Sequence, residues 1–177
     1  MKAPVFGVTG WKNSGKTTLV ARLVAEFVRR GYRVSTAKHA HHAFDIDKPD
    51  TDSFRHREAG ASEVVIVSGY RWALMHELRD EPEPALGAVL ERFSPCDLIL
   101  IEGYKRESHP KIEVRRKEAH REQALAPDDP SIVAIAADHA TDVAGLPLFD
   151  IDDVAAIADF IAGHVELPSR EEAHADV

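Results

Sequence analysis

Short apolar runs alternate with longer amphipathic segments along most of the chain. Residues 4–9 are mostly apolar and β-branched and are bounded by proline and glycine, which is typical of a buried strand. Apolar side chains then recur at helical spacing from Leu19 to Val28, and Gly31 stands where a helix commonly ends. A second strand is expected over residues 32–37. This alternation predicts an α/β fold.

Strands and helices continue to alternate through the rest of the chain. Gly69-Tyr70 is expected to form a tight turn that lets two apolar runs pair as an antiparallel hairpin. Four consecutive aliphatic residues at 98–101 predict a buried parallel strand, whereas 111–115 alternates charged and apolar residues and is expected to be partly exposed. The other expected strands are 63–67, 71–76, 132–137 and 147–149, and the other expected helices are 53–58 (capped by Thr51 or Asp52), 85–93, and one capped by Asp150, Asp152 or Asp153 that continues to Ile161.

The turn between the first strand and the first helix carries the phosphate-loop pattern G-x-x-x-x-G-K-[ST]. Glycines let successive backbone N–H groups point at phosphate oxygens, and the positive end of the following helix favours the same anion. We expect Lys16 to reach the β- and γ-phosphates and the Thr17 hydroxyl to bind Mg²⁺. The expected nucleotide-binding residues of the loop are Gly10, Asn13, Ser14, Gly15, Lys16, Thr17 and Thr18.

A strand, a glycine loop and a helix in this order indicate a P-loop NTPase-like fold. We expect a doubly wound, mostly parallel sheet with an antiparallel hairpin extension. A chain of 177 residues is long enough for one such domain and short for two. The domain is expected over residues 1–164, and the charged, apolar-poor residues 165–177 are expected to form a disordered tail.

Two carboxylates follow buried strands and are candidates for nucleotide chemistry. Glu102 lies at the carboxyl end of its strand, where a carboxylate in phosphate-loop proteins binds Mg²⁺ or orients the attacking water. Asp138 could accept two hydrogen bonds from guanine, through N1–H and the exocyclic amine, and adenine offers no such donor pair. The familiar Asn-Lys-x-Asp guanine motif is absent. Residue chemistry alone therefore leaves the choice between GTP and ATP open.

Residues 38–52 form a polar segment at the end of the second expected strand, where open α/β sheets bind ligands. His39, His41 and His42, with Asp45 and Asp47 nearby, would supply enough ligands for zinc or nickel. Their spacing is not diagnostic of a metal site, so we favour a loop that senses phosphate or contacts a partner.

Arg71-Trp72 is a second candidate for ligand contact. A guanidinium and an indole can stack on a flat heteroaromatic ligand. The alternative interpretation is an edge-strand tryptophan that packs into the core.

Composition narrows the class of protein. The formal net charge of −8 argues against broad binding to nucleic acid or to a membrane surface, because both need basic faces. Cys96 is the single cysteine, so an internal disulfide is excluded and a cytoplasmic location is expected. We expect no membrane span and no signal peptide, since no apolar run is long enough and the first strand begins at once.

Several segments of the chain, which follow one another in the family's order, resemble the MobB family of molybdopterin-guanine dinucleotide biosynthesis adapter proteins. The histidine–aspartate segment together with Arg71–Met75 is far more specific than the phosphate loop, which many families share. In this chain Asp50 and Thr51 stand where the family usually has Gly and Lys, so the chain lacks a cation that could act on phosphate or cofactor. The similar segments are Gly10–Leu19, Lys38-His39-x-His41-His42, Asp45-x-Asp47-Lys48-Pro49, Asp52-Ser53, Ala59-Gly60-Ala61, Arg71–Met75 and Asp97–Lys105.

The resemblance implies a homodimeric GTP-binding protein with weak Mg²⁺-dependent GTPase activity. It would assist the molybdopterin guanylyltransferase that joins GMP to molybdopterin during molybdenum-cofactor maturation. Lys16 and Glu102 would be catalytic, and Thr17, Asp45 and Glu102 would form the metal site. The residues expected to contact cofactor or partner are Lys38, His39, His42, Asp47, Arg71 and Trp72.

Three other functions fit the same residues. An ATP-dependent small-molecule kinase or ligase would need a lid with arginines, and the only candidate cluster comprises Arg115, Arg116, Lys117 and Arg121. A metal-insertion GTPase would use the His39, His41 and His42 loop. In a carrier dimer, hydrolysis would be incidental.

Overall fold

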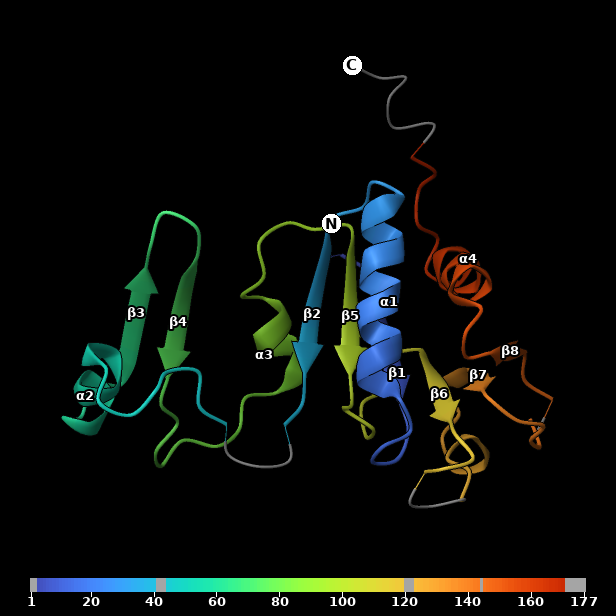
Figure 1. Ribbon diagram of the computed structural model, residues 1–177, viewed down its shortest axis with the longest axis horizontal. Helices are drawn as coiled ribbons and strands as arrows, with labels where there is room; N and C mark the ends of the chain where they lie inside the picture. Colours follow the sequence, from blue (N-terminus) through green and yellow to red (C-terminus); the bar gives the residue numbers. More distant parts are fainter. Residues whose placement is uncertain (1–2, 41–43, 120–122, 144, 171–177) are drawn as a thin grey trace. The chain divides into compact units, whose positions relative to one another are not determined.

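The computed structural model describes residues 3–40, 44–119, 123–143 and 145–170 (Figure 1). The chain divides into two compact units. The first comprises residues 1–39 and 90–177, and the second comprises residues 40–89. This division is finer than the single expected domain, and each unit is described by itself.

The first unit is built on a six-stranded sheet in the order β2-β5-β1-β6-β7-β8. Every neighbouring pair of strands is parallel, which confirms the predicted sheet. The strand order reverses at β1, and ligands bind at the carboxyl ends of strands at such a switch point. The strands are β1 (Val5–Thr9), β2 (Val34–Lys38), β5 (Leu98–Glu102), β6 (Lys111–Arg115), β7 (Ile132–Ala137) and β8 (Leu148–Asp150).

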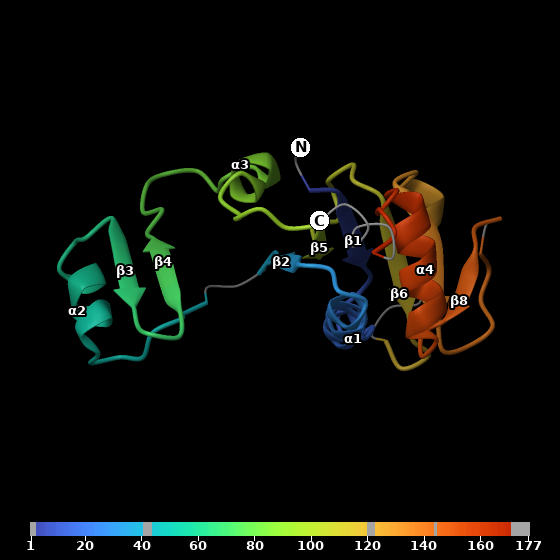
Figure 2. The same cartoon turned by 90° about the horizontal axis from the view of Figure 1, so that it is seen from above.

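Helices α1 (Lys16–Arg29) and α4 (Val154–His164) pack together on one face of this sheet. Figure 2 looks along α1 and shows it end-on beside the strands. Side chains alternate between the faces of a strand, so the even-numbered positions of β1, β5, β6 and β7 reach this core together. The fully buried core side chains include Phe6, Leu23, Phe27, Leu98, Leu100, Ile112, Ile157 and Ile161.

The expectation that residues 111–115 are partly exposed is wrong. Strand β6 lies between β1 and β7, and both Lys111 and Glu113 are buried. The Lys111 ammonium donates hydrogen bonds to Ser131 Oγ at 2.8 Å and to the carbonyl oxygen of Glu107, and it pairs with Asp129 at 3.2 Å. The alternation of charged and apolar residues therefore marks an interior strand whose polar side chains are satisfied.

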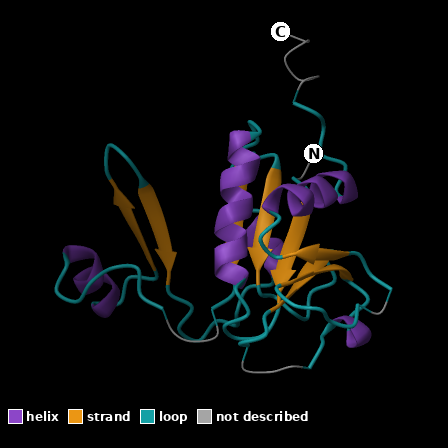
Figure 3. Cartoon of the chain, turned by 45° about the vertical axis from the view of Figure 1, so that its right-hand side comes forward, coloured by secondary structure: helices purple, strands orange, loops and turns teal. Residues whose placement is uncertain are grey.

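The second unit contains an antiparallel hairpin of β3 (Glu63–Val67) and β4 (Trp72–His76), as predicted. Thr51 caps the N-terminus of helix α2 (Asp52–Glu58), because its hydroxyl accepts a hydrogen bond from the backbone N–H of Phe54. Figure 3 shows α2 beside the hairpin at the end away from its turn.

Three short segments complete the described fold. Helix α3 (Leu86–Leu90) falls where the two units join in the sequence, and the 3-10 helix η1 (Ala126–Asp128) precedes β7. Residues 165–170, within the expected tail, pack onto the rest of the first unit. Leu167 packs against its core, and the Tyr32 hydroxyl donates to the carbonyl oxygen of Pro168 at 2.8 Å. Residues 171–177 lie outside the described residues.

Candidate nucleotide-binding site

The loop between β1 and α1 has the backbone that the phosphate-loop pattern demands. Gly10, Asn13 and Gly15 all adopt positive φ angles, of 146°, 64° and 92°. A Cβ atom on Gly10 would lie 2.6 Å from both the Ser14 hydroxyl and the carbonyl oxygen of Val114, so no larger residue fits. Gly15 caps α1 without a side-chain hydrogen bond. The first N–H groups of this helix are therefore available to an anion.

Lys16 is the first residue of α1, and its ammonium turns back across the loop. Its Nζ donates to the carbonyl oxygen of Trp11 at 2.6 Å. Burial lowers the pKa of Lys16, the nearby cations Lys105 and Lys38 lower it further, and Glu102 acts in the opposite direction. An ammonium that shares its surroundings with two other cations is well placed to bind a polyanion.

The register of the sheet brings Glu102 to the phosphate loop. Strand β5 lies between β1 and β2, so Glu102 is paired with Val8 on one side and Lys38 on the other. Glu102 Oε1 accepts a hydrogen bond from Thr17 Oγ1 at 2.7 Å and lies 3.1 Å from Lys38 Nζ. A hydroxyl and a carboxylate so close together are the oxygen donors that Mg²⁺ prefers.

His39 follows Lys38 and lies beside the same strand end. Its backbone N–H donates to the carbonyl oxygen of Glu102 at 3.1 Å, and its ring centroid lies 4.9 Å from that of Tyr104. Of the residues expected to contact cofactor or partner, Lys38 and His39 are thus beside the phosphate loop. His41 and His42 lie outside the described residues.

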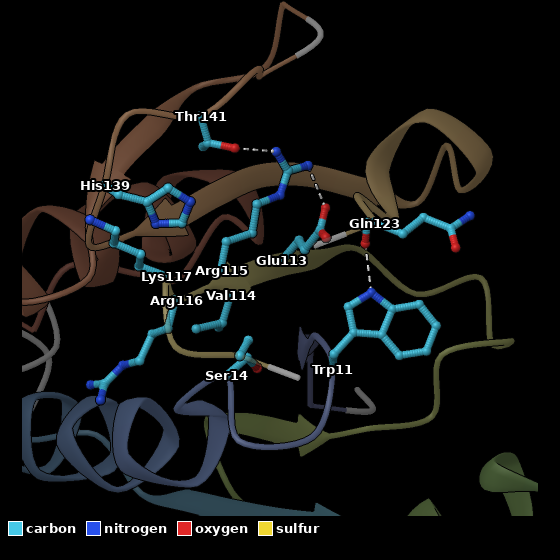
Figure 4. A pocket seen from close by; sticks show the side chains of 11 residues that line it. Trp11, Ser14, Glu113, Val114, Arg115, Arg116, Lys117, Gln123, His139 and Thr141 are labelled. Carbon is cyan, nitrogen blue, oxygen red and sulfur yellow. Dashed lines mark hydrogen bonds and ion pairs between the residues drawn. The ribbon is translucent and has the colours of Figure 1, made fainter. Parts of the chain in front are cut away.

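A cavity of about 280 Å³ lies beside the loop (Figure 4). The buried Glu113 carboxylate builds one wall by accepting backbone N–H groups of Leu125 at 2.8 Å and Ala126 at 3.0 Å. Trp11 closes another side, since its indole N–H donates to the carbonyl oxygen of Gln123 at 2.6 Å. The lining residues are Trp11, Ser14, Glu113, Val114, Arg115, Arg116, Lys117, Ala119, Gln123, His139 and Thr141.

Sequence reasoning did not single out Trp11, Glu113 or Gln123. Trp11 occupies a variable position of the loop pattern, and Gln123 acts through its backbone. The one available signal was Glu113, a charged residue between the aliphatic residues Ile112 and Val114.

Asp138 lies next to two residues that line this cavity. Its Oδ1 accepts the backbone N–H of Lys117 at 3.0 Å and lies 2.8 Å from His139 Nδ1. The hydrogen bond from His139 lowers the pKa of Asp138, burial opposes this, and the Lys117 N–H adds to the lowering. One oxygen of the carboxylate that we expect to read a base is thus already engaged.

The remaining candidates belong to the second unit. Asp47 and Asp45 face Arg57, whose Nη2 lies 2.6 Å and 3.3 Å from their carboxylates. Trp72 is 68% exposed, so the interpretation of a core-packed tryptophan is wrong. Arg71, the residue before it, is also exposed. Within the described ranges, no three His, Cys, Asp or Glu side chains converge as a metal site would require.

Comparison with known proteins gives a consistent family. Residues 5–138 match the family model for molybdopterin guanine dinucleotide synthesis protein B, MobB. The molybdopterin-guanine dinucleotide biosynthesis adapter protein of Escherichia coli K12 is 40% identical over 161 residues, which cover 89% of this chain and 91% of that protein. The protein of the same name from Haemophilus influenzae is 39% identical over 161 residues, which cover 89% of this chain and 87% of that protein.

Solved structures agree. A crystal structure of molybdopterin-guanine biosynthesis protein B superposes with a TM-score of 0.71 at 28% identity, covering 92% of this chain and 99% of that one. A MobB homologue from Bacillus stearothermophilus gives a TM-score of 0.67 at 28% identity, covering 93% and 99%. No helix within the described part of the chain has the length and apolarity needed to cross a membrane. Since the family model and these relatives span most of the sequence, the chain belongs to the MobB family of molybdopterin-guanine dinucleotide biosynthesis adapter proteins.

Proposed function

We propose that the chain acts in molybdopterin-guanine dinucleotide biosynthesis as a GTP-binding adapter with weak GTPase activity. One observation carries this proposal. The N-terminus of α1 has no side-chain cap, and it lies with the positive-φ glycines and the Lys16 ammonium in the loop that follows β1. Backbone N–H groups and a lysine in this arrangement bind the phosphates of a nucleotide.

The residues present also fit a magnesium ion. Thr17 and Glu102 would hold it. Asp45, the further ligand that the sequence suggests, belongs to the second unit, where it lies 3.3 Å from Arg57 Nη2. When bound, Mg²⁺ would neutralise charge on the β- and γ-phosphates. Lys16 would bind the same phosphates, and Glu102 would also orient the attacking water. Hydrolysis by such a site should be slow unless a further cation stabilises the developing charge.

Guanine is the proposed base. Asp138 would accept its N1–H and exocyclic amine, and the cavity beside the phosphate loop would hold the ring. The names of the relatives favour guanine too, because they are described as adapters in the biosynthesis of a guanine dinucleotide.

The proposed partner is the enzyme that joins GMP to molybdopterin. Lys38 and His39 would contact this enzyme or its cofactor from beside the phosphate loop, and His42 is a further candidate from the sequence alone. Asp47, Arg71 and Trp72 would do so from the second unit. Cys96 has no second cysteine in the chain to pair with, so a reducing cytoplasm is the proposed location.

Calorimetric titration tests the nucleotide assignment. Wild-type protein is titrated with GTP and with ATP, each with and without Mg²⁺. We expect GTP to bind more tightly than ATP and Lys16→Ala to abolish binding. Arg29→Ala removes a cation from the far end of the same helix and should leave binding unchanged. Equal or tighter binding of ATP would refute the choice of base, and undiminished binding by Lys16→Ala would refute the site.

A further inference from the structure

The three described cations of the segment 115–117 have different surroundings. Arg115 is tied to the fold, because its Nη2 pairs with Glu113 at 2.7 Å and its Nη1 donates to Thr141 Oγ1 at 3.0 Å. Lys117 is exposed, and its backbone N–H is held by Asp138. Arg116 differs from both, because none of its guanidinium nitrogens has a hydrogen bond or ion pair with another described residue.

Arg116 nevertheless occupies a defined place. A Cβ atom built on Gly15 would lie 2.7 Å from Arg116 Nε and 3.1 Å from Cζ, so the guanidinium lies directly against this glycine. Its Nε is buried and lacks a partner. Figure 4 shows Arg116 pointing toward the start of α1, whereas Arg115 points to the opposite side of the cavity. Burial of a charged donor without a partner is costly, and a bound anion would remove that cost.

We propose that Arg116, the residue directly after β6, binds the α- and β-phosphates of the nucleotide in the same chain as the phosphate loop. Gly15 supplies part of the loop backbone that cradles these two phosphates, and a guanidinium matches two phosphate oxygens at once. This inference rests on the proposed function, and it adds a phosphate ligand that lies outside the loop motif.

The cations near Lys16 explain why the assignment is to the α- and β-phosphates. Lys38 Nζ lies 3.1 Å from Glu102 Oε1, so this cation lies on the side of the loop where the metal and the γ-phosphate would bind. Arg116 lies against Gly15 and lines the cavity that would hold the base. Arg116 therefore contributes to binding and not to the charge that develops on the transferred phosphoryl group.

Titration of the wild type, Arg116→Ala and Arg116→Lys with GTP, GDP and ATP tests this. We expect Arg116→Ala to weaken GTP and GDP by the same factor, about 10- to 100-fold, because a hydrogen bond to a charged group has that effect. Arg116→Lys keeps the charge but loses the two-pronged contact and should fall between the wild type and alanine. The kcat for hydrolysis at saturating GTP should change less than about threefold in both variants, since the contact is the same in ground and transition states.

The outcomes separate this inference from the proposed function. Arg33→Ala, at the amino end of β2 and away from the phosphate loop, is the control for loss of one positive charge. Failure of the proposed function appears in the wild type, as ATP binding that equals GTP binding or as no nucleotide binding. The inference fails if Arg116→Ala binds GTP and GDP with the same dissociation constants as the wild type. A large fall in kcat at unchanged affinity would also overturn it, because Arg116 would then act on the γ-phosphate.

Discussion

Single residues decide what the phosphate loop can do. Glu102 contacts both Thr17 and Lys38, so one carboxylate oxygen links the helix that begins at the loop to the neighbouring strand. This link preorganises the site, because a carboxylate held by two partners is fixed in position before any ligand binds.

Replacement of this carboxylate by an amide separates binding from hydrolysis. We expect Glu102→Gln to bind GTP in the presence of Mg²⁺ within about tenfold of the wild type, and to hydrolyse it at least about tenfold more slowly, because water is no longer oriented. Phosphate release under single-turnover conditions measures the effect, and Glu107→Gln, exposed and outside the site, serves as control. Unchanged hydrolysis would remove Glu102 from the proposed mechanism.

The same variant also tests whether hydrolysis matters in cells. If Glu102→Gln still supports cofactor maturation, the protein acts as a carrier and hydrolysis is incidental.

His109 gives the stability of the first unit a dependence on pH. Both of its ring nitrogens are buried without a partner among the described residues, and the ring lies on Gly7 of β1. Burial lowers the pKa of His109 to about 4, Lys111 lowers it further, and Asp129 opposes this. The unfolded chain takes up the proton near pH 6.5 and the folded chain does so only near pH 4. The contribution of His109 to stability is therefore complete above pH 6.5 and is lost as the pH falls toward 4.

Urea unfolding at several pH values tests this account. The wild type should lose stability between pH 6.5 and pH 4.5, and His109→Gln should lose less over the same interval, since glutamine does not titrate. Parallel curves for the two proteins would show that acidic groups elsewhere cause the whole effect.

At this scale the sequence predicted the motif residues and missed their partners. Lys16, Thr17 and Glu102 could be found because a local pattern and a strand end mark them. Arg116 was found only as a member of a cluster of candidate lid cations, and Glu113 only as one charge of an alternating strand, because their roles depend on which strand lies beside β1. That neighbour comes from more than a hundred residues further along the chain.

At the scale of elements, the end of α1 illustrates a local signal that was read correctly. Gly31 has a φ of 87°, its N–H donates to the carbonyl oxygen of Val28, and the N–H of Tyr32 donates to that of Phe27. The rings of Phe27 and Tyr32 meet edge-on at 5.9 Å. These contacts form a Schellman motif with its usual apolar contact.

Two glycine substitutions separate backbone strain from crowding. A Cβ atom on Gly31 would meet nothing closer than 3.9 Å, so Gly31→Ala causes no crowding. It should lower the free energy of unfolding by about 1–2 kcal/mol, because alanine is strained in the left-handed backbone conformation. Gly163 lies inside α4 with open space around it, and Gly163→Ala should stabilise the protein by about 0.5–1 kcal/mol. Urea midpoints that shift in these opposite directions would confirm the account, and equal shifts would contradict it.

The incorrect element was β6. Alternation of charged and apolar residues normally indicates a strand with one solvent-exposed face. Here the buried side chains of Lys111 and Glu113 form hydrogen bonds with polar groups of the segments around them, so both charged groups are satisfied inside the protein. Strand position in the sheet, which the local pattern does not contain, decided the outcome.

At the scale of the whole molecule, the hairpin presents an apolar face. Strand pairing places Val65 opposite Leu74 and Val67 opposite Trp72, on the face away from the buried Val64 and Met75. These four side chains are exposed, and Val67 is 72% exposed. Contiguous exposed apolar groups on a hairpin favour association with another protein surface. We propose this face as part of the homodimer contact.

A charge on this face should therefore change the oligomeric state. We expect the wild type to be a dimer and Val67→Glu to be a monomer at micromolar concentration, because an unpaired carboxylate would be buried in the contact. Light scattering coupled to gel filtration measures the mass. Arg55→Glu, on the exposed surface of α2, is the control for a change of charge. A monomeric wild type, or a dimeric Val67→Glu, would remove the hairpin from the contact.

The position of Trp11 gives the molecule an optical reporter of its own. Its indole is anchored to Gln123 on one side of the cavity, and the Lys105 ammonium lies 4.0 Å from its ring centroid. A polyphosphate that draws Lys105 away would remove a positive charge from above the indole and alter its emission. The chain has two tryptophans, so Trp72→Phe leaves Trp11 as the sole emitter. Nucleotide entry could then be followed in real time, without a label, by stopped-flow fluorescence.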